Sequence, residues 1–274
     1  MTLQSPPEPG ADASPTVRPA RRGIDHALVL VGEILITAGV ILGLFVVWQL
    51  FYTDVQSGRT QAAALNELTF PETPRVAAST GAGAAAQPAA PALVELIPDD
   101  LKVYSPAGAP VLGEQSEATT FGALHVPRWG YDYVKPISEG TSRARVLDAL
   151  GIGHYADTAM PGEVGNFSLA GHRTTYGKPF TDIQTIEVGD PLVVQTDAAW
   201  YIYRVTETHI VKPTYVAAIA PTPDQPGVAP TVASITLTTC HPRYSAAQRY
   251  IVHGELEYWA PTGHGYPSEI VEGA

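Results

Sequence analysis

Three residues in the C-terminal half of the chain are of types that together perform acyl transfer. Cys240 is the one cysteine of the protein, and His172 and Arg249 are the histidine and arginine that we consider with it. A thiol attacks a carbonyl carbon when a base or cation makes or stabilises its thiolate and a donor meets the developing oxyanion. An imidazole suits the first task and a guanidinium either one. These residues therefore predict covalent catalysis at Cys240.

Each of the three residues is expected at the end or start of a strand. Cys240 follows Ser234–Thr239, where apolar and hydroxyl residues alternate as in a strand with one face in the core. His172 follows a second apolar run, and Pro242 ends the ladder after Cys240 because proline has no N–H. If the segment that follows is a loop between paired strands, Arg249 lies beside Cys240 at one sheet edge.

The supporting elements are short apolar runs that begin at about residue 93. Runs rich in Val, Ile, Thr and Tyr, mostly bounded by Gly, Pro, Asp or Asn, predict strands. They are Phe121–Val126, Asn166–Ala170, Pro191–Thr196, Trp200–Thr206, His209–Val211, Val232–Thr239 and Tyr250–Glu257. The clearest helix is Thr141–Leu150, with Thr141 or Ser142 as its cap. Many short strands and few helices predict a mainly β fold, either a sandwich or a closed barrel.

An apolar segment precedes this domain. Residues 27–51 would form a helix about 37 Å long, enough to cross a hydrocarbon core of about 30 Å. Arg18, Arg21 and Arg22 precede it and only Arg59 follows closely, which predicts a cytoplasmic N-terminus. A cleaved signal peptide would have a shorter apolar region with a small-x-small site close behind it, and none follows here.

These patterns divide the chain into four parts. We expect a cytoplasmic tail over residues 1–26, a single-pass anchor in the lipid bilayer over 27–52, a linker over 53–92 and one extracellular domain over 93–274. Residues 71–92 hold nine Ala and four Pro and too little apolar surface to offset the entropy of ordering. Residues 53–68 could instead extend the helix. The net charge of −11 argues against a nucleic-acid partner, which requires a basic face.

The sequence around these residues resembles the sortase family. Residues 236–240 read TLTTC and are similar to the sortase TLxTC signature, and an arginine follows at a similar distance. The resemblance covers about residues 120–258, and His241-Pro242 and Thr174–Gly177 make it most similar to the class E branch of high-GC Gram-positive bacteria. Further sortase-like segments are Gly153–Tyr155, Pro161-Gly162, Gly165-Asn166 and Ala170–Arg173.

The resemblance implies an eight-stranded β-barrel with short helices and a Cys–His–Arg active site. Cys240 would attack the carbonyl of a sorting-signal threonine, and His172 would protonate the departing glycine amine and later deprotonate the incoming one. Arg249 would position the substrate and stabilise the oxyanion, and Thr239 would help to orient the substrate. The substrates would be exported proteins with a C-terminal LAxTG rather than LPxTG signal. The acceptor would be an amine of a cell-wall precursor or a pilin, and the reaction needs no cofactor.

Other classes of protein fit less well. Structural zinc usually shows close ligand pairs such as CxxC or HxxxH, and we predict no metal because the sequence contains none. A papain-like hydrolase or an L,D-transpeptidase would carry a different signature at the cysteine, although a thiol hydrolase of another kind stays possible. A non-catalytic adhesion or scaffold module on a membrane stalk would leave Cys240, His172 and Arg249 without a role. Arg243 is nearer to Cys240 but lies within the loop, where we expect it to be solvated.

Overall fold

The structure is a computed structural model that describes residues 22–68, 70 and 94–274. It contains two compact units, residues 1–49 and residues 50–274. The predicted tail up to residue 21 and the Ala/Pro-rich part of the predicted linker, residues 71–92, lie outside the described residues.

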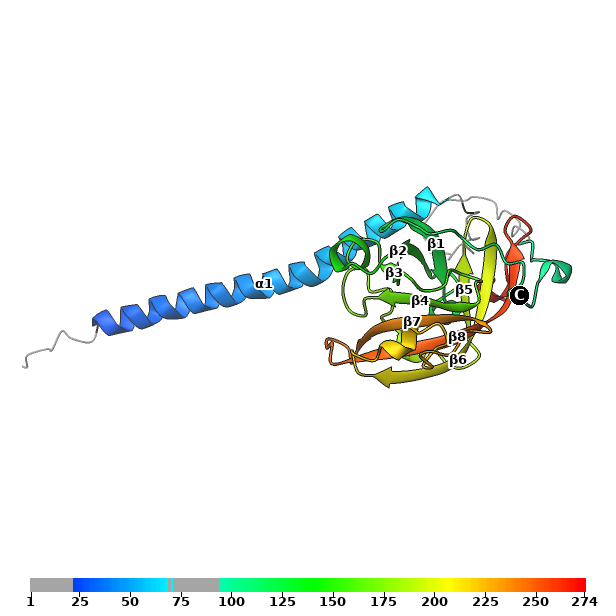
Figure 1. Cartoon of the computed structure of the whole chain (residues 1–274). Coiled ribbons are helices and arrows are strands. Elements are labelled where there is room, and N and C mark those ends of the chain that lie inside the picture. The colour runs from blue at the N-terminus through cyan, green and yellow to red at the C-terminus, as the bar shows by residue number, and fades with distance from the viewer. Residues whose placement is uncertain (1–21, 69, 71–93) are drawn as a thin grey trace, which may run out of the picture. The chain divides into compact units, whose positions relative to one another are not determined.

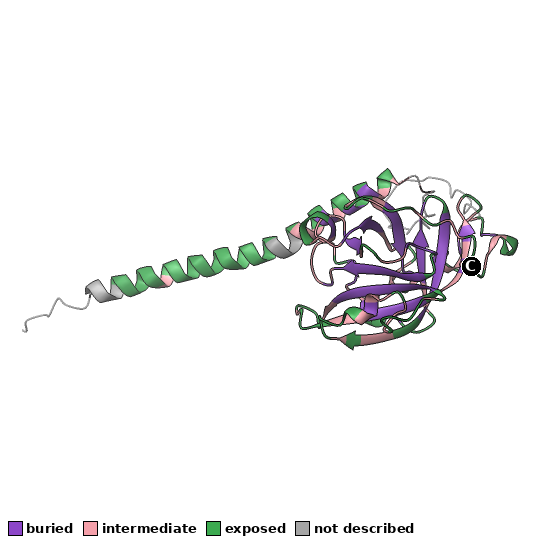
Figure 2. Cartoon of the chain, viewed as in Figure 1, coloured by how far each residue is buried: buried purple, intermediate pink, exposed green. Residues whose placement is uncertain are grey.

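The first element is the long helix α1 (Arg22–Glu67). Large apolar side chains from Leu28 to Trp48 are exposed along it, as the green part of the helix in Figure 2 shows. By length and composition this helix can cross a membrane.

The second unit is built on a closed barrel of eight strands (Figure 1). The order around the barrel is β1-β2-β3-β4-β7-β8-β6-β5. The pairs β2–β3 and β4–β7 are parallel and the other pairs are antiparallel. This closed barrel confirms the predicted mainly β fold. The strands are β1 (Thr120–His125), β2 (Val134–Glu139), β3 (Ile152–His154), β4 (Gly165–Gly171), β5 (Pro191–Gln195), β6 (Ala199–Val211), β7 (Ala233–His241) and β8 (Gln248–Pro261).

The main core fills the barrel, with Phe167, Leu237 and Val252 among its fully buried members. On β6, Tyr201 and Tyr203 belong to this core, whereas Trp200 and Ile202 pack in a second cluster outside it. The aromatic run therefore alternates between two buried faces of one strand. Short helical turns lie between the strands and on either side of the barrel in the chain: η1 (Asp99–Leu101), η2 (Pro127–Trp129), η3 (Arg143–Leu147), η4 (Ile183–Thr185), η5 (Val216–Ile219) and η6 (Ser268–Ile270).

The helix predicted over Thr141–Leu150 is wrong. The segment is the single wide turn η3, in which Asp148 N donates to Arg143 O at 2.7 Å, a bond that spans five residues. The Ser142 hydroxyl makes no capping bond. Gly140 and Gly151 have left-handed φ angles of 89° and 95° and so confine the helical stretch at both ends.

Two strands had no sequence signal. β2 contains Lys135 and Pro136, which weaken a strand pattern, and β3 has only three residues. Conversely, the two runs predicted over 200–206 and 209–211 form the continuous strand β6, with a register irregularity between Val205 and Glu207. A bulge of this kind interrupts the alternation without ending the strand.

The first part of the predicted linker is helical. α1 continues to Glu67, and Ala64 is 6% exposed. The helix face that contains Ala64 also carries Asp54, Ser57 and Gln61. These three side chains form hydrogen bonds with the barrel part of the same unit. Sequence analysis did not resolve this packing because a polar stripe produces no apolar periodicity.

Candidate active site

The thiol of Cys240 lies near the end of β7 and is partly exposed. In the antiparallel pair β7–β8, the residue directly opposite Cys240 is Arg249. Cross-strand partners have Cβ atoms only about 5 Å apart. The predicted proximity of the two residues at one sheet edge is therefore confirmed.

His172 follows β4, which runs parallel to β7 on the side away from β8. The register pairs Ala170 with Thr238. Continued by two residues, it brings His172 alongside Cys240, and a bond between the residues in between supports this: the Thr239 hydroxyl donates to Gly171 O at 2.7 Å. Thus β7 carries the thiol between a histidine on one neighbouring strand and an arginine on the other.

The imidazole of His172 is held by a carboxylate that the sequence analysis did not identify. Its Nε2 lies 2.7 Å from Asp148 Oδ1, and the two side chains are 19% and 21% exposed. Asp148 directly follows the wide turn η3, whose shape sets the direction of this carboxylate. Because Nε2 is bonded to Asp148, Nδ1 is the ring nitrogen left for other partners.

Arg173, the neighbour of His172, is a second residue whose role was missed. It is 5% exposed, and its Nη1 donates to His241 Nδ1 at 2.8 Å and to Cys240 O at 3.4 Å. Its Nη2 donates to Gln184 Oε1. Burial lowers the pKa of Arg173, but an arginine remains charged at neutral pH. Burial, and next the positive charge of Arg173, lower the pKa of His241, which favours the neutral imidazole that accepts this bond.

Arg173 fixes the end of β7. It bonds the main chain of Cys240 and the side chain of His241, so the last two residues of the strand are tied to the residue that follows His172. The signal for this role was present in the sequence, since Arg173 adjoins His172, but only the strand register reveals what it contacts.

Arg249 and Arg243 differ in their surroundings. The guanidinium of Arg249 donates through Nη1 to the carbonyl oxygens of Ala246 and Gln248, at 3.1 and 2.9 Å. Arg243 donates to Thr181 O at 2.8 Å and forms an ion pair with Asp182 at 2.9 Å. Arg243 therefore forms contacts where we expected it to be solvated. Arg249 bonds to the carbonyl oxygens of two residues close to it in the chain and lies opposite Cys240.

Thr239 is 3% exposed and uses its one hydroxyl proton in the bond to Gly171 O. This side chain fastens β7 to β4 and has no donor left for a substrate. Thr238, the other threonine before the cysteine, shares a face with Cys240, and its Oγ1 lies 3.0 Å from the hydroxyl of Tyr155. The contact of Thr239 with the substrate stays a prediction, and the structure shows this hydroxyl in a bond between strands.

The loop after His172 is braced by the end of α1. Tyr176, Gly177 and Lys178 all have left-handed φ angles, of 55°, 73° and 36°. Gln61 Nε2 donates to Tyr176 O at 3.1 Å, Gly177 N donates to Asp54 Oδ1 at 3.2 Å, and Lys178 pairs with Asp54 at 2.9 Å. A backbone conformation that ordinary residues avoid is therefore held by three polar contacts from the helix.

The same helix also touches the segment that carries Asp148. Ser57 Oγ donates to Asp148 O at 2.8 Å. The helix thus contacts both partners of the imidazole–carboxylate pair, one through the loop that follows His172 and the other through the main chain of Asp148.

Comparison with known proteins identifies the family to which the chain is similar. The model of the sortase domain family matches residues 124–257. Sortase SrtE1 of Streptomyces coelicolor is 36% identical over 88% of this chain, which spans 60% of that relative. Sortase SrtE2 of the same organism is 34% identical over 87% of this chain and 85% of its own length.

Solved structures agree as well. The crystal structure of Sortase E1 from Streptomyces coelicolor with a tripeptide in the active site has a TM-score of 0.53 and 39% sequence identity. The similarity covers 58% of this chain and 100% of that one. The predicted fold and the predicted family are both confirmed. With its nucleophile between a histidine strand and an arginine strand of a closed barrel, the chain belongs to the sortase family, whose members are cysteine transpeptidases, and within that family it is class E-like.

Proposed function

We propose that this protein cleaves the Thr–Gly bond of a C-terminal sorting signal and transfers the acyl group to an amine. The observation that carries the proposal is the strand register, with Arg249 directly opposite Cys240 and His172 at the end of the neighbouring parallel strand. A thiol, an acid–base group and an oxyanion donor on three adjacent strands are the parts that acyl transfer needs.

The reaction proceeds in two steps that share one thioester. Sulfur of Cys240 attacks the threonine carbonyl carbon, Arg249 turns from its loop carbonyls to the developing oxyanion, and the C–N bond breaks as His172 protonates the glycine amine. The acceptor amine then attacks the thioester, gives its proton to His172 and releases the thiolate. Asp148 stabilises the charged imidazole that is present before the first step and forms again when the acceptor amine gives up its proton, and no other reagent is consumed.

The substrate in this proposal is an exported protein with an LAxTG-type signal, and the acceptor is an amine of a cell-wall precursor or a pilin. The preference for LAxTG over LPxTG is what the resemblance to class E sortases implies. The tripeptide in the active site of the related Sortase E1 supports a peptide substrate for this chain as well.

We propose that α1 anchors the protein in the cell membrane with the barrel unit outside. The apolar helix and the arginines before it support this orientation. Protease added to intact protoplasts is expected to remove residues 94–274 and spare the N-terminal tail, whereas protection of the barrel unit contradicts the proposed topology.

The enzymatic proposal is tested with the full chain in detergent, because the end of α1 contacts the active-site loop. LAxTG and LPxTG peptides are incubated with and without an added amine, and products are read by mass spectrometry. We expect an adduct on Cys240, an amide product with the amine, and turnover of LAxTG faster by about ten- to a hundredfold, since one side chain in an apolar pocket distinguishes the peptides.

The matched control is Cys240→Ala, which must form no adduct. Faster turnover of LPxTG removes the substrate preference but leaves the transpeptidase. Hydrolysis that an amine does not affect indicates a thiol hydrolase. If no adduct forms and a thiol reagent leaves Cys240 unlabelled in the folded chain, the scaffold alternative holds.

A further inference from the structure

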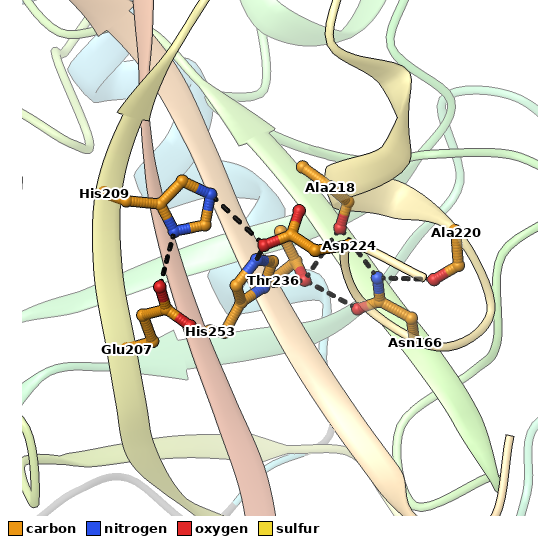
Figure 3. A network of polar contacts seen from close by, with 8 residues as sticks. All are labelled: Asn166, Glu207, His209, Ala218, Ala220, Asp224, Thr236 and His253. Carbon is orange, nitrogen blue, oxygen red and sulfur yellow. Dashed lines mark hydrogen bonds and ion pairs between the residues drawn. The ribbon is translucent and has the colours of Figure 1, made fainter. Parts of the chain in front are cut away.

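Three side chains of metal-binding types converge outside the active site (Figure 3). His209 from β6, His253 from β8 and Asp224 from the loop between β6 and β7 turn toward one another. Asp224 Oδ2 lies 3.3 Å from His209 Nε2 and 3.3 Å from His253 Nε2. All three ligand atoms lie within 4.8 Å of one another.

Two of these separations, those from Asp224 to each histidine, suit a tetrahedral metal ion. Ligand atoms bound to zinc at about 2.0 to 2.1 Å lie about 3.3 to 3.4 Å from one another in a tetrahedron. Both nitrogen-to-oxygen distances match that edge. Two imidazoles and one carboxylate are also a set that Zn²⁺ takes in proteins, with the fourth position left to water.

The hydrogen bonds behind His253 fix which of its nitrogens carries a proton. Asn166 Nδ2 donates to two loop carbonyl oxygens, at 3.0 and 2.9 Å, so its Oδ1 must accept from the Thr236 hydroxyl at 2.7 Å. Thr236 has then used its proton and accepts from His253 Nδ1 at 2.8 Å. In the neutral ring, the lone pair of His253 Nε2 therefore points at a carboxylate oxygen of Asp224.

The lone pair of His253 Nε2 and the negative charge of Asp224 Oδ2 repel each other unless a proton or a metal ion lies between the two atoms. The other oxygen, Asp224 Oδ1, is buried and has no partner at ordinary hydrogen-bond geometry, although the charge of Asp224 raises the pKa of the nearby Tyr215 hydroxyl. A buried carboxylate oxygen without a well-aligned donor is costly. A divalent cation at the point where the three side chains meet would satisfy both the lone pair of His253 and the charge of Asp224.

His253 also has the outer partner that a metal-bound imidazole usually has, the Thr236 hydroxyl. Outer partners of this kind orient the ring and raise its basicity toward the metal. Glu207 Oε1 lies 3.6 Å from His209 Nδ1, which is beyond hydrogen-bond distance. Asp224 is itself fixed, with a left-handed φ of 61° and its N–H bonded to Ala217 O at 2.9 Å.

We propose that His209, Asp224 and His253 bind a divalent transition-metal ion, best matched by Zn²⁺, which fastens the loop of residues 212–232 to the barrel. Asn166 already holds this loop at a second point through its two carbonyl bonds. The loop would thus be attached to the barrel at two points, through Asn166 and through the metal bound to Asp224. This site does not depend on the transpeptidase proposal, because none of its ligands takes part in acyl transfer.

The site lies on the same sheet face as the nucleophile. Cys240, Arg249 and Val211 are paired in one row across β7, β8 and β6. Two rows further along the same face, Thr236, His253 and Glu207 are paired in the same way. Successive rows on one face are about 6.6 to 6.8 Å apart. The loop that the metal would fasten starts directly after Val211, beside Arg249, so metal binding would also order the surface next to the active site.

The sequence analysis predicted no metal because it searched for closely spaced ligands. These three ligands come from two strands and a loop, and only the pairing of β6 with β8 brings them together. The sequence alone therefore contained no spacing that could reveal them.

The test measures zinc bound to the full chain in detergent. Cys240→Ala is the background, so that the active-site thiol cannot bind the ion. After removal of metal with EDTA, the protein is dialysed against Zn²⁺ and its metal content is measured by mass spectrometry. We expect one Zn²⁺ per chain, and His209→Ala or Asp224→Asn weakens binding by at least about a hundredfold. His264→Ala is the matched control, because His264 is exposed and outside the cluster.

A second readout guards against variants that fail to fold. At a hundredfold excess over its dissociation constant, Zn²⁺ should raise the melting temperature of the background chain by about 5 to 10 °C. It should leave the melting temperature of a folded Asp224→Asn variant unchanged. Zinc that binds only when Cys240 is present, or binding that Asp224→Asn leaves intact, overturns the proposal, as does failure of the background chain to bind zinc.

Discussion

Replacement of Asp148 by asparagine tests the imidazole–carboxylate pair most directly. The substitution removes the negative charge while it keeps the size of the side chain and one oxygen acceptor for His172 Nε2. At 2.7 Å, the attraction of two full charges is about 1.5 kcal/mol in water and about 6 kcal/mol at an effective dielectric constant of about 20.

Because His172 and Asp148 are partly exposed to water, we expect their attraction to lie in the lower part of this energy range. Both side chains are about a fifth exposed, and Arg143 Nε lies 3.8 Å from the same carboxylate oxygen and already offsets some of its charge. Hydrogen bonds to charged groups contribute about 1.5 to 3 kcal/mol. We therefore expect a loss of about 2 kcal/mol, which corresponds to a fall of about thirtyfold in kcat/KM.

The assay is steady-state transfer by the full chain with an LAxTG peptide and an amine. The loss should appear in kcat, with KM changed by less than about twofold, because the carboxylate stabilises the charge that forms on His172 as the acceptor amine gives up its proton. Asp148→Ala should lose more, since the ring is then unoriented as well. Asp182→Asn is the matched control: it removes an exposed carboxylate that pairs with Arg243 and should have little effect.

Two results would refute this reasoning. If both Asp148 variants stay within about threefold of the parent, the carboxylate does not assist His172. If KM rises and kcat is unchanged, Asp148 contributes to substrate binding instead.

Three further predictions follow from other features. Arg249→Ala should lower kcat/KM by at least about a hundredfold, as expected for an oxyanion donor, and Arg243→Ala by much less; the reverse order would show that Arg243 is the functional arginine. Burial lowers the pKa of His125 to about 4, so the folded chain gains this proton well below the pH of about 6.5 at which the unfolded chain does. The free energy of unfolding should fall by up to about 3 kcal/mol as the pH drops from about 6.5 to about 4, and urea titrations of a His125→Gln variant should lack this part of the slope. Gly177→Ala should lower both the melting temperature and kcat, because its Cβ would lie 2.6 Å from Gln61 Nε2. Gly189→Ala is the control for backbone strain alone, because Gly189 has a left-handed φ of 93° and open space where its Cβ would lie. Equal losses in the two variants would contradict the stabilising contact of Gln61 with the loop after His172.

The sequence was informative where function depends on local pairing. Cys240 and Arg249 are joined by one short loop, so a strand pattern and a proline were enough to predict that they meet. The β fold also followed from local patterns, except where β2 and β3 carry charged residues, a proline or too few residues to show alternation.

The rest of the site depends on contacts that no local pattern encodes. His172 reaches Cys240 through a parallel pairing of distant segments, and family resemblance rather than periodicity indicated it. Asp148 lies after a turn whose wide hydrogen bonds have no sequence signature. The helix brace uses Asp54 and Gln61, polar residues in a segment that composition suggested could be a linker.

The parallel pairing of β4 with β7 has a consequence for when the enzyme becomes reactive. The bond from Thr239 to Gly171 joins residues 68 positions apart in the chain. Contacts across such a separation form slowly, because a long loop must close before any of them stabilises it. Cys240 and His172 are therefore brought together only when the barrel closes. In the proposed mechanism an unfolded chain lacks this pairing, so folding would act as the activation step.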